Sequence, residues 1–330
     1  MNKKILLISQ SPSDIRFVLT LYEKYKDSYD VEIIVVGVKN NYHFLCQSLP
    51  SHNVQFVSIP KFREYIKLLS FSFVLRSLRK KLVQKYKDDH IYFFSRFGDY
   101  ATAYLIDALK KNNTILYVDS VYSYVSEIIE PNQSVVLNIK GKIKKNYLRY
   151  LLFFEMKFVN ISGPAVEYYD TKNNVSDISI TIDEKVYSKY GYSVECAHKK
   201  KSILFFESNG MTESYFEKYD IELKLIIDFL CDKYDLYIKP HPSHGSSSVW
   251  DEYDVNFLPG YIPAEFINVE SFDKVVGIES AALANIRHPK KVSLINFFGF
   301  TDESIKHNFQ KYITNHSIDD VSFPCNINFV

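Results

Sequence analysis

The sequence predicts an α/β fold made of two domains, each with its own parallel sheet, and three observations support this prediction. The chain has 330 residues, which is about the length of two domains. Short apolar runs alternate with helix-like segments in the first half, and the alternation resumes after a less regular stretch between Pro131 and Lys201. Such alternation is typical of βαβ units, in which helices cover both faces of a parallel sheet.

The first expected strand is Lys4–Ser9, and a helix is expected to start near Ser13, which suits an N-cap. The strand's apolar run has only four residues, whereas a secretion signal needs about 7–15. No window approaches the roughly 18 apolar residues of a membrane span, so we expect a cytoplasmic protein. The other elements expected in the first half are the strands Val31–Gly37, Val54–Ile59, His90–Ser95 and Thr114–Asp119 and the helices Phe62–Lys87 and Tyr100–Lys111.

The second half repeats this pattern after the breakers Gly163-Pro164 and Lys172-Asn173-Asn174. We therefore place an N-terminal Rossmann-like domain at residues 1–162 and a C-terminal one at residues 163–330. The expected strands are Ser202–Glu207, Leu236–Lys239, Val255–Leu258, Lys274–Gly277 and Val292–Phe297, and the expected helices are Glu213–Lys233, Pro263–Val269 and Ser280–Arg287.

Composition and motif spacing exclude several classes of function. The net charge is +1, from 40 basic and 39 acidic residues, which argues against a nucleic-acid partner. The closest two of the ten glycines, Gly245 and Gly260, are fifteen positions apart, so neither a dinucleotide fingerprint nor a P-loop is present. The sequence contains no D-x-D, no H-E-x-x-H and no cysteine cluster, and we expect neither a metal nor another cofactor. The four scattered cysteines suit reduced thiols.

Ligands of open parallel sheets bind outside the carboxyl ends of the strands, and His241 is the most specific residue there. It follows a buried strand in Lys239-Pro240-His241-Pro242, where two prolines restrict the backbone on either side. A histidine held in this way can donate to a phosphate oxygen or pass a proton to a leaving group. The alternative is a histidine packed in a surface turn.

Glu265 and Ser280 follow the next strand ends, and each has a structural alternative. Glu265 lies in the first turn of a short expected helix after Gly260, where it can accept from ribose hydroxyls or simply favour the helix start. Ser280, three residues after Gly277, is placed to cap a helix. A helix start also binds anions, so Ser280 can mark a phosphate site that needs no glycine loop.

His-Pro after a strand, then Pro-x-Glu, then a serine at a helix start resembles the bacterial sialyltransferases of the GT-B type. Within that type, the motifs resemble those of the lipooligosaccharide and capsule sialyltransferases and the polysialyltransferases. The resemblance is sharpest over Ser202–Asn285. It implies two Rossmann-like domains facing a central cleft. The N-terminal domain would hold the acceptor, and the C-terminal domain would bind the donor, CMP-sialic acid. The resemblance further implies that His241 contacts the CMP phosphate and acts as the acid, that Glu265 holds the ribose and that Ser280 binds the phosphate.

The chain departs from this family in places. A second hydroxyl residue of the family is replaced by Ala281, so one phosphate hydrogen bond is missing or comes from elsewhere, for example from Ser246–Ser248. The donor-binding set that we expect is Lys239, His241, Pro242, Gly260, Glu265, Gly277, Ser280 and Ala281. Inversion needs a carboxylate base. Asp119, Glu207 and Glu213 are the alternatives, with Glu213 slightly favoured.

Two basic stretches, Arg76–Lys87 and Lys140–Arg149, are either solvated helix faces or patches that meet anionic lipid. The resemblance implies an inverting, metal-independent sialyltransferase that acts on a hydroxyl of a bacterial surface glycan. The second interpretation of the basic stretches adds a lipid-linked acceptor and peripheral contact at the inner face of the membrane. The alternatives are a transferase for another CMP-activated acid sugar, of the Kdo or legionaminic type, and a non-catalytic nucleotide-binding scaffold.

Overall fold

The computed structural model divides the chain into two units, Met1–Val186 and Tyr187–Val330, and each is described here by itself. It describes residues 3–60, 65–94, 100–118, 146–147, 149–153, 175–196, 200–207, 215–242 and 245–329. The expected boundary at 162/163 lies outside the described residues and stays a prediction.

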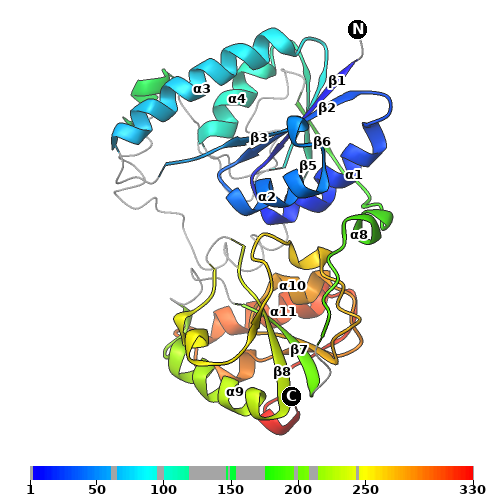
Figure 1. Cartoon of the computed structure of the whole chain (residues 1–330). Coiled ribbons are helices and arrows are strands. Elements are labelled where there is room, and N and C mark those ends of the chain that lie inside the picture. Colours follow the sequence, from blue (N-terminus) through cyan, green and yellow to red (C-terminus); the bar gives the residue numbers. More distant parts are fainter. Residues whose placement is uncertain are drawn as a thin grey trace. The chain divides into compact units, whose positions relative to one another are not determined.

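The first unit contains a parallel sheet with the strand order β3-β2-β1-β4-β5-β6 among its described residues (Figure 1). Helices α3 and α4 lie together on one side of this sheet, and α1 and α2 lie on the other. The strands are β1 (Lys4–Ser9), β2 (Asp30–Val36), β3 (Val54–Val57), β4 (His90–Phe93), β5 (Thr114–Val118) and β6 (Val175–Ile178), and the helices are α1 (Ile15–Tyr25), α2 (Lys39–Ser48), α3 (Tyr65–Lys85) and α4 (Tyr100–Leu109).

Burial explains why the strands of the first unit read as continuous apolar runs. In β1, Leu6 and Ile8 belong to the core formed with α3 and α4, and the alternating residues Ile5 and Leu7 are buried as well. Successive side chains of a strand point to opposite faces. A strand covered by helices on both faces is therefore apolar at every position.

The second unit contains a parallel sheet with the order β12-β11-β10-β7-β8-β9 in the part of the chain that is described. Helices α10 and α11 lie side by side, whereas α9 lies beside β8 (Figure 1). The strands are β7 (Lys201–Phe206), β8 (Tyr234–Lys239), β9 (Asn256–Phe257), β10 (Lys274–Gly277), β11 (Lys291–Ser293) and β12 (Val321–Ser322), and the helices are α9 (Tyr219–Lys233), α10 (Ala281–Asn285) and α11 (Glu303–His316), with α8 (Lys185–Tyr190) at the join of the units.

The two sheets share one topology. Numbered within its own unit, each sheet has its strands in the order 3-2-1-4-5-6, which is the doubly wound Rossmann order. The order reverses between β1 and β4 in the first unit and between β7 and β10 in the second. The prediction of two Rossmann-like parallel sheets is confirmed, and these reversal points are where ligands of such folds bind.

The helix expected at Glu213–Lys233 begins later, at Tyr219. The residues before it form tertiary contacts instead: the Glu217 N–H donates to the Gly299 carbonyl, and the Thr301 N–H donates to the Tyr215 carbonyl. The Phe216 ring lies 4.6 Å from the Phe300 ring, centroid to centroid. Long-range pairing therefore overrides the local preference for helix, and the prediction of helix at residues 216–218 is wrong.

Several other expected elements are shorter than predicted, and three of them lie in the second unit near the carboxyl edge of its sheet. The strand expected at Val292–Phe297 ends at Ser293, because the Leu294 N–H donates to the Gly277 carbonyl and the chain then turns into the 3₁₀ helix Ile295–Phe297. The helix expected from Pro263 is only the 3₁₀ turn Ala264–Phe266. The helix expected at Ser280–Arg287 is α10, with Ser280 as its N-cap.

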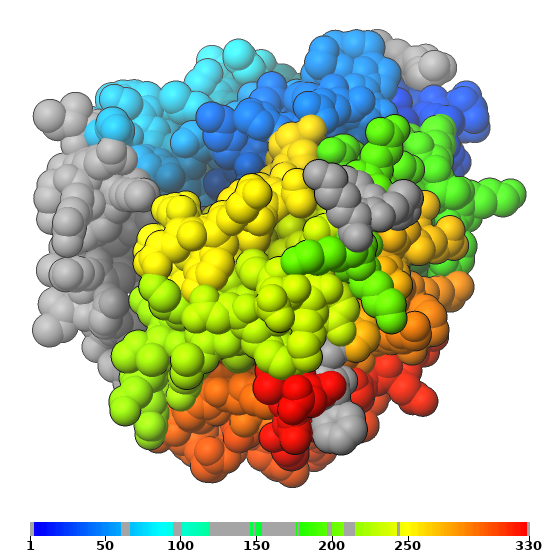
Figure 2. All heavy atoms as spheres, turned by 60° about the horizontal axis from the view of Figure 1, so that its bottom comes forward, coloured from blue at the N-terminus to red at the C-terminus, as the bar shows by residue number. Residues whose placement is uncertain are grey.

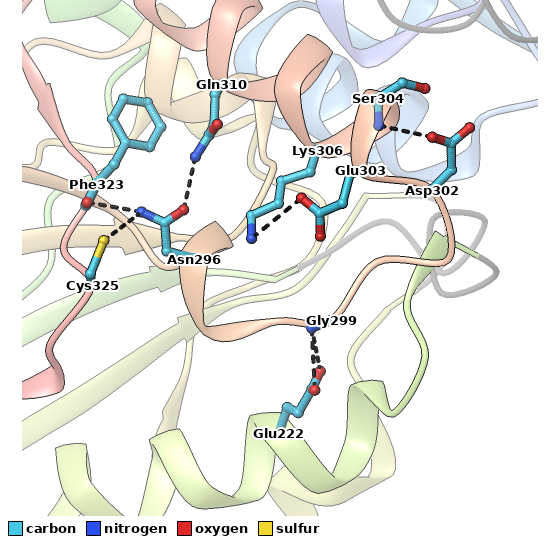
Figure 3. Close-up of polar contacts among 10 residues, drawn as sticks. All are labelled: Glu222, Asn296, Gly299, Asp302, Glu303, Ser304, Lys306, Gln310, Phe323 and Cys325. Atoms are coloured by element: carbon cyan, nitrogen blue, oxygen red, sulfur yellow. Dashed lines mark hydrogen bonds and ion pairs between the residues drawn. The ribbon is translucent and has the colours of Figure 1, made fainter.

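Polar contacts hold the loop that follows β11 (Figure 3). The Gly299 N–H donates to both carboxylate oxygens of Glu222 on α9, each at 3.2 Å. Asn296 accepts from the Gln310 side chain at 2.9 Å and donates to the Phe323 carbonyl at 2.9 Å. These bonds connect the loop to α9 and α11, so the segment at this end of β11 is fixed from two sides.

Candidate functional site

A buried ammonium group lies at the carboxyl end of β8. Lys239 is only 3% exposed, and its Nζ donates to the carbonyls of Pro240 at 2.6 Å and Gly260 at 3.2 Å. Burial lowers the pKa of Lys239 to about 8, against the opposing effect of the Glu265 carboxylate. The side chain therefore connects the loop that carries His241 to the loop that leads to Glu265.

His241 lies in a narrow turn closed by two backbone hydrogen bonds. Its N–H donates to the Gly245 carbonyl at 2.8 Å, and the Gly245 N–H donates back at 2.9 Å. Gly245 has φ +80°, a left-handed conformation that glycine adopts without strain. His241 and Pro242 are half-buried, so the turn holds the imidazole at the sheet edge without enclosing it.

Glu265 is hydrogen-bonded to α10, and its carboxylate is near enough to Lys239 to raise the pKa of that side chain. It lies in the 3₁₀ turn Ala264–Phe266 and accepts from the Asn285 side-chain amide at 3.5 Å. Asn285 is the last residue of α10. The structure thus brings together Lys239, Gly260 and Glu265, with Asn285 as a fourth member that the sequence analysis missed.

Ser280 is the N-cap of α10, and its hydroxyl accepts from the Ala282 N–H at 3.3 Å. Among the described residues no group accepts the hydroxyl hydrogen of Ser280, so it can be donated to an anion. Half-buried Ala281 is the first residue of the helix. Packing explains why residue 277 is a glycine. A Cβ there would lie 3.2 Å from Leu283 Cδ1, so the glycine lets α10 approach β10 closely. Ser280 follows β10 and His241 follows β8. These strands run parallel in one sheet, so both residues lie at its carboxyl edge.

Of the three alternative bases, only Glu207 lies among the described residues, and its carboxylate is engaged. It is 5% exposed, and it accepts from Tyr219 Oη at 2.9 Å, from the Ser247 N–H at 3.4 Å and from Trp250 Nε1. These bonds hold β7, α9 and the 3₁₀ helix Ser248–Glu252 together.

The serines suggested as a substitute phosphate ligand are partly engaged too. Ser247 caps the 3₁₀ helix Ser248–Glu252 by accepting from the Val249 N–H at 3.3 Å, and it donates to Asp220 at 3.2 Å. This 3₁₀ helix and α9 lie side by side at the surface, as the yellow and yellow-green atoms of Figure 2 show. Ser247 thus has a structural role in joining the two helices.

Two buried residues were missed besides Asn285. Glu279 is 2% exposed and lies between β10 and the cap residue Ser280. Trp250 is fully buried and donates to Glu207. An acid two residues after a buried strand and the one tryptophan of the chain were the available signals. The partner of Trp250, however, is 43 positions away in the sequence.

The first basic stretch lies on α3, and its arginines have partners. Arg76 donates to the Leu151 carbonyl and lies over the Phe153 ring. Arg79 pairs with Asp107 at 3.6 Å. Lys80 and Lys81 are exposed, as are the apolar side chains of Leu69, Phe73 and Val74 on the same helix. Most of the second stretch, residues 140–145 and 148, lies outside the described residues, as do Asp119 and Glu213.

In the part of the chain that is described, no cluster of three or more His, Cys, Asp or Glu side chains is arranged to hold a metal ion. No helix within the same residues is both long and apolar enough to cross a membrane.

Comparison with known proteins gives likenesses of fold only. No family model matches the chain, and no curated protein matches it. Among solved structures, E. coli heptosyltransferase WaaC with ADP is 10% identical, with 98% of this chain and 94% of that chain covered and a TM-score of 0.45. UDP-GlcNAc 2-epimerase from Neisseria meningitidis bound to UDP-GlcNAc is 12% identical, with 98% and 96% covered and a TM-score of 0.48. The glycosyl transferase family 9 structure from Veillonella parvula DSM 2008 is 14% identical, with 98% and 87% covered and a TM-score of 0.43. Likenesses this weak carry no argument about activity, and the fold assignment depends on the strand order of the two sheets.

Proposed function

We propose that this chain is a nucleotide-sugar-dependent glycosyltransferase, and specifically an inverting sialyltransferase that uses CMP-sialic acid. One observation carries the proposal: the carboxyl edge of the second sheet holds His241 in a closed turn beside the buried Lys239, which is in turn near Glu265. His241 can donate a proton to the phosphate, Lys239 supplies a positive charge near it, and the Glu265 carboxylate can accept hydrogen bonds from the ribose hydroxyls. The identity of the sugar depends on the sequence resemblance alone.

In the proposed reaction, the acceptor hydroxyl attacks the anomeric carbon of the sugar while the bond to the CMP phosphate breaks. His241 donates a proton to the departing phosphate, and Ser280 offers its hydroxyl hydrogen to another phosphate oxygen. Glu265 accepts from the ribose hydroxyls. Lys239 positions the loops that carry His241 and Glu265, and its positive charge favours the departing anion. The chemistry needs no metal, because CMP leaves with a single phosphate.

The base is one of the three carboxylates named above, which takes the proton from the acceptor hydroxyl. The hydrogen bonds that Glu207 accepts favour a structural role for it and leave Asp119 and Glu213 as the stronger alternatives. Replacing Asp119 by Asn and Glu213 by Gln separates them: the base variant loses turnover while it still binds CMP. If both variants keep full turnover, neither residue is the base.

The direct test measures CMP release from CMP-sialic acid, with acceptor, in the wild type and in His241→Ala. We expect kcat to fall by about 10²-fold or more, as is usual when a general acid is removed. His52→Ala, at an exposed histidine of the first unit, is the matched control and should behave as the wild type. Unchanged turnover in His241→Ala would refute the role.

Two alternatives have distinct outcomes in this assay. Turnover of a CMP-linked Kdo or legionaminic-type donor in place of CMP-sialic acid would identify a transferase for another acid sugar. A non-catalytic scaffold would be stabilised by CMP against heat without turning over any donor.

We also propose that a lipid-linked acceptor brings the enzyme to the inner face of the membrane. Lys80 and Lys81, with the exposed apolar residues Phe73 and Val74 on α3, support this contact. Replacing both lysines by Glu should weaken binding to anionic vesicles about fivefold or more, since each lysine near such a surface contributes about 1 kcal/mol. Lys311→Glu on α11 is the control, and equal binding of all three proteins would argue against the contact.

A further inference from the structure

Arg16, which has no anionic partner among the described residues, lies near the carboxyl edge of the first sheet. Arg16 is the second residue of α1 and is half-buried. Its Nε is fully buried and has no hydrogen-bond partner. Within the described part of the chain, the guanidinium forms no hydrogen bond or ion pair, and its Cζ lies 5.1 Å from the centroid of the Phe17 ring. A guanidinium stays charged and carries five donors, so one that is partly buried and unpaired suits an anionic ligand.

The position of Arg16 agrees with a ligand site. The Phe17 ring, over which Arg16 lies, packs 6.4 Å from the ring of Phe94, which directly follows β4. Helix α1 follows β1. β1 and β4 are the two neighbours between which the strand order of this sheet reverses. The guanidinium is therefore near the place where doubly wound sheets bind their ligands.

The loop between β1 and α1 adds hydroxyl groups to this edge. The side chains of Ser11 and Ser13 are half-buried and lie 2.9 Å apart, Oγ to Oγ. Gln10, in the same loop, donates to Thr102 on α4. The loop that precedes Arg16 therefore carries hydroxyl groups, and a sugar with an acidic substituent is bound by hydroxyl groups together with a cation.

The acidic residue nearest to Arg16 in the sequence, Asp14, accepts hydrogen bonds from the same loop. Asp14 is fully buried, and its Oδ2 accepts from the Ser9 hydroxyl at 3.2 Å and from the N–H groups of Gln10 at 2.7 Å and Ser11 at 2.8 Å. Its negative charge is therefore satisfied by the loop.

We propose that Arg16 binds an oxyanion on the acceptor, either a carboxylate or a phosphate of an acidic sugar, at the reversal point of the first sheet. Planar guanidinium groups bind both anions through paired hydrogen bonds. The inference rests on the proposed function, in that it takes the first unit to hold the acceptor. It adds that the acceptor is itself negatively charged and that Arg16 selects it over a neutral sugar.

The test measures binding to the full chain of three probes: sialyllactose, which carries a carboxylate, glucose 6-phosphate, which carries a phosphate, and neutral lactose. We expect the wild type to bind one of the two acidic probes more tightly than lactose, and the tighter one identifies the anion. Arg16→Gln should weaken that binding about tenfold or more and leave lactose binding unchanged. Arg16→Lys keeps the charge without the planar donors and should lie between the two.

Lys24→Gln is the matched control. Lys24 lies at the other end of α1, with its Nζ 5.1 Å from the Tyr25 ring centroid, as Arg16 lies from Phe17. Its replacement removes the same charge and should not change binding of the acidic probe. Equal binding by wild type and Arg16→Gln, an equal loss in Lys24→Gln, or no preference of the wild type for an acidic probe would each overturn the inference. If Arg16→Gln does not fold, Arg16→Lys decides by the same criteria.

The outcome is separable from that of the proposed function. His241→Ala should keep the preference for the acidic probe, and Arg16→Gln should keep CMP binding. Binding of the acidic probe that depends on Arg16, without turnover of any CMP-linked donor, would support this site and refute the transferase. If the wild type turns over the donor but shows no preference for an acidic probe, the transferase would be supported and the Arg16 site refuted.

Discussion

The two sheets have the same strand order but different chemistry at their carboxyl edges. In the second unit, Lys239, Glu207 and Glu279 are buried charged side chains at strand ends, and Lys239 joins two loops through backbone carbonyls. In the first unit, the described edge is a loop of neutral polar residues around buried Asp14, beside Arg16. The shared topology therefore gives each sheet a carboxyl edge of the kind that binds ligands, while the side chains at each edge decide which ligand can bind there.

This contrast explains how a phosphate site can exist in a chain with so few glycines. A glycine-rich loop binds phosphate through backbone N–H groups. The second edge instead presents side chains. One is the Lys239 ammonium, which is buried but donates hydrogen bonds to two carbonyls, and the other is the His241 imidazole in a closed turn. The closest glycines, Gly245 and Gly260, contribute a left-handed turn and a carbonyl acceptor to this arrangement.

The largest effect that would sharpen the contrast is expected from Lys239→Met. The substitution removes both hydrogen bonds that tie the His241 loop to the Gly260 loop, so we expect kcat/KM for the CMP-linked donor to fall about 10²-fold. Lys200→Met is the matched control, because Lys200 also donates to two carbonyls, those of Cys231 and Asp232, but is exposed and precedes β7. If kcat/KM falls by a comparable factor in both variants, the hydrogen bonds of Lys239 do not position the donor site.

A smaller effect is expected on stability as a function of pH. The pKa of Lys239 is lowered by burial to about 8 from an ordinary value of 10.5, so between these values the unfolded chain binds more protons than the folded chain. Stability from this group therefore rises with pH across that window. From pH 7.5 to 9.5, the free energy of unfolding of the wild type should rise by about 2 kcal/mol relative to Lys239→Met. Urea titrations measure this difference, and a constant difference would show that the pKa of Lys239 is not depressed.

The sequence predicted the strands better than the helices, for a physical reason. β1 and β10 have the bounds that were predicted, because strands covered on both faces are continuous apolar runs with clear ends. The short edge strands β6 and β12 were missed. Helices α2, α8 and α11 were missed as well, and α9 was predicted to start too early, at Glu213. Its true start depends on the pairing of residues 215–217 with residues 299–301, which no local pattern reveals.

The site divides in the same way. His241, Glu265 and Ser280 could be selected because strand ends are readable from sequence and prolines mark a rigid turn. The hydrogen bond from Asn285 to Glu265 and the bonds that engage Glu207 join elements 20 and up to 43 positions apart. The sequence analysis gave Glu207 nearly the same weight as Asp119 and Glu213, with Glu213 slightly favoured, because the burial and the partners of Glu207 depend on the folded chain.

The central claim is that the nucleotide binds at the edge of the second sheet and not at that of the first. Hydrogen exchange of the wild-type chain with and without CMP tests this claim most directly. We predict slower exchange in the segments around residues 239–245, 260–266 and 277–285, with residues 9–18 unchanged. Protection confined to residues 9–18, with none in the second unit, would contradict the account.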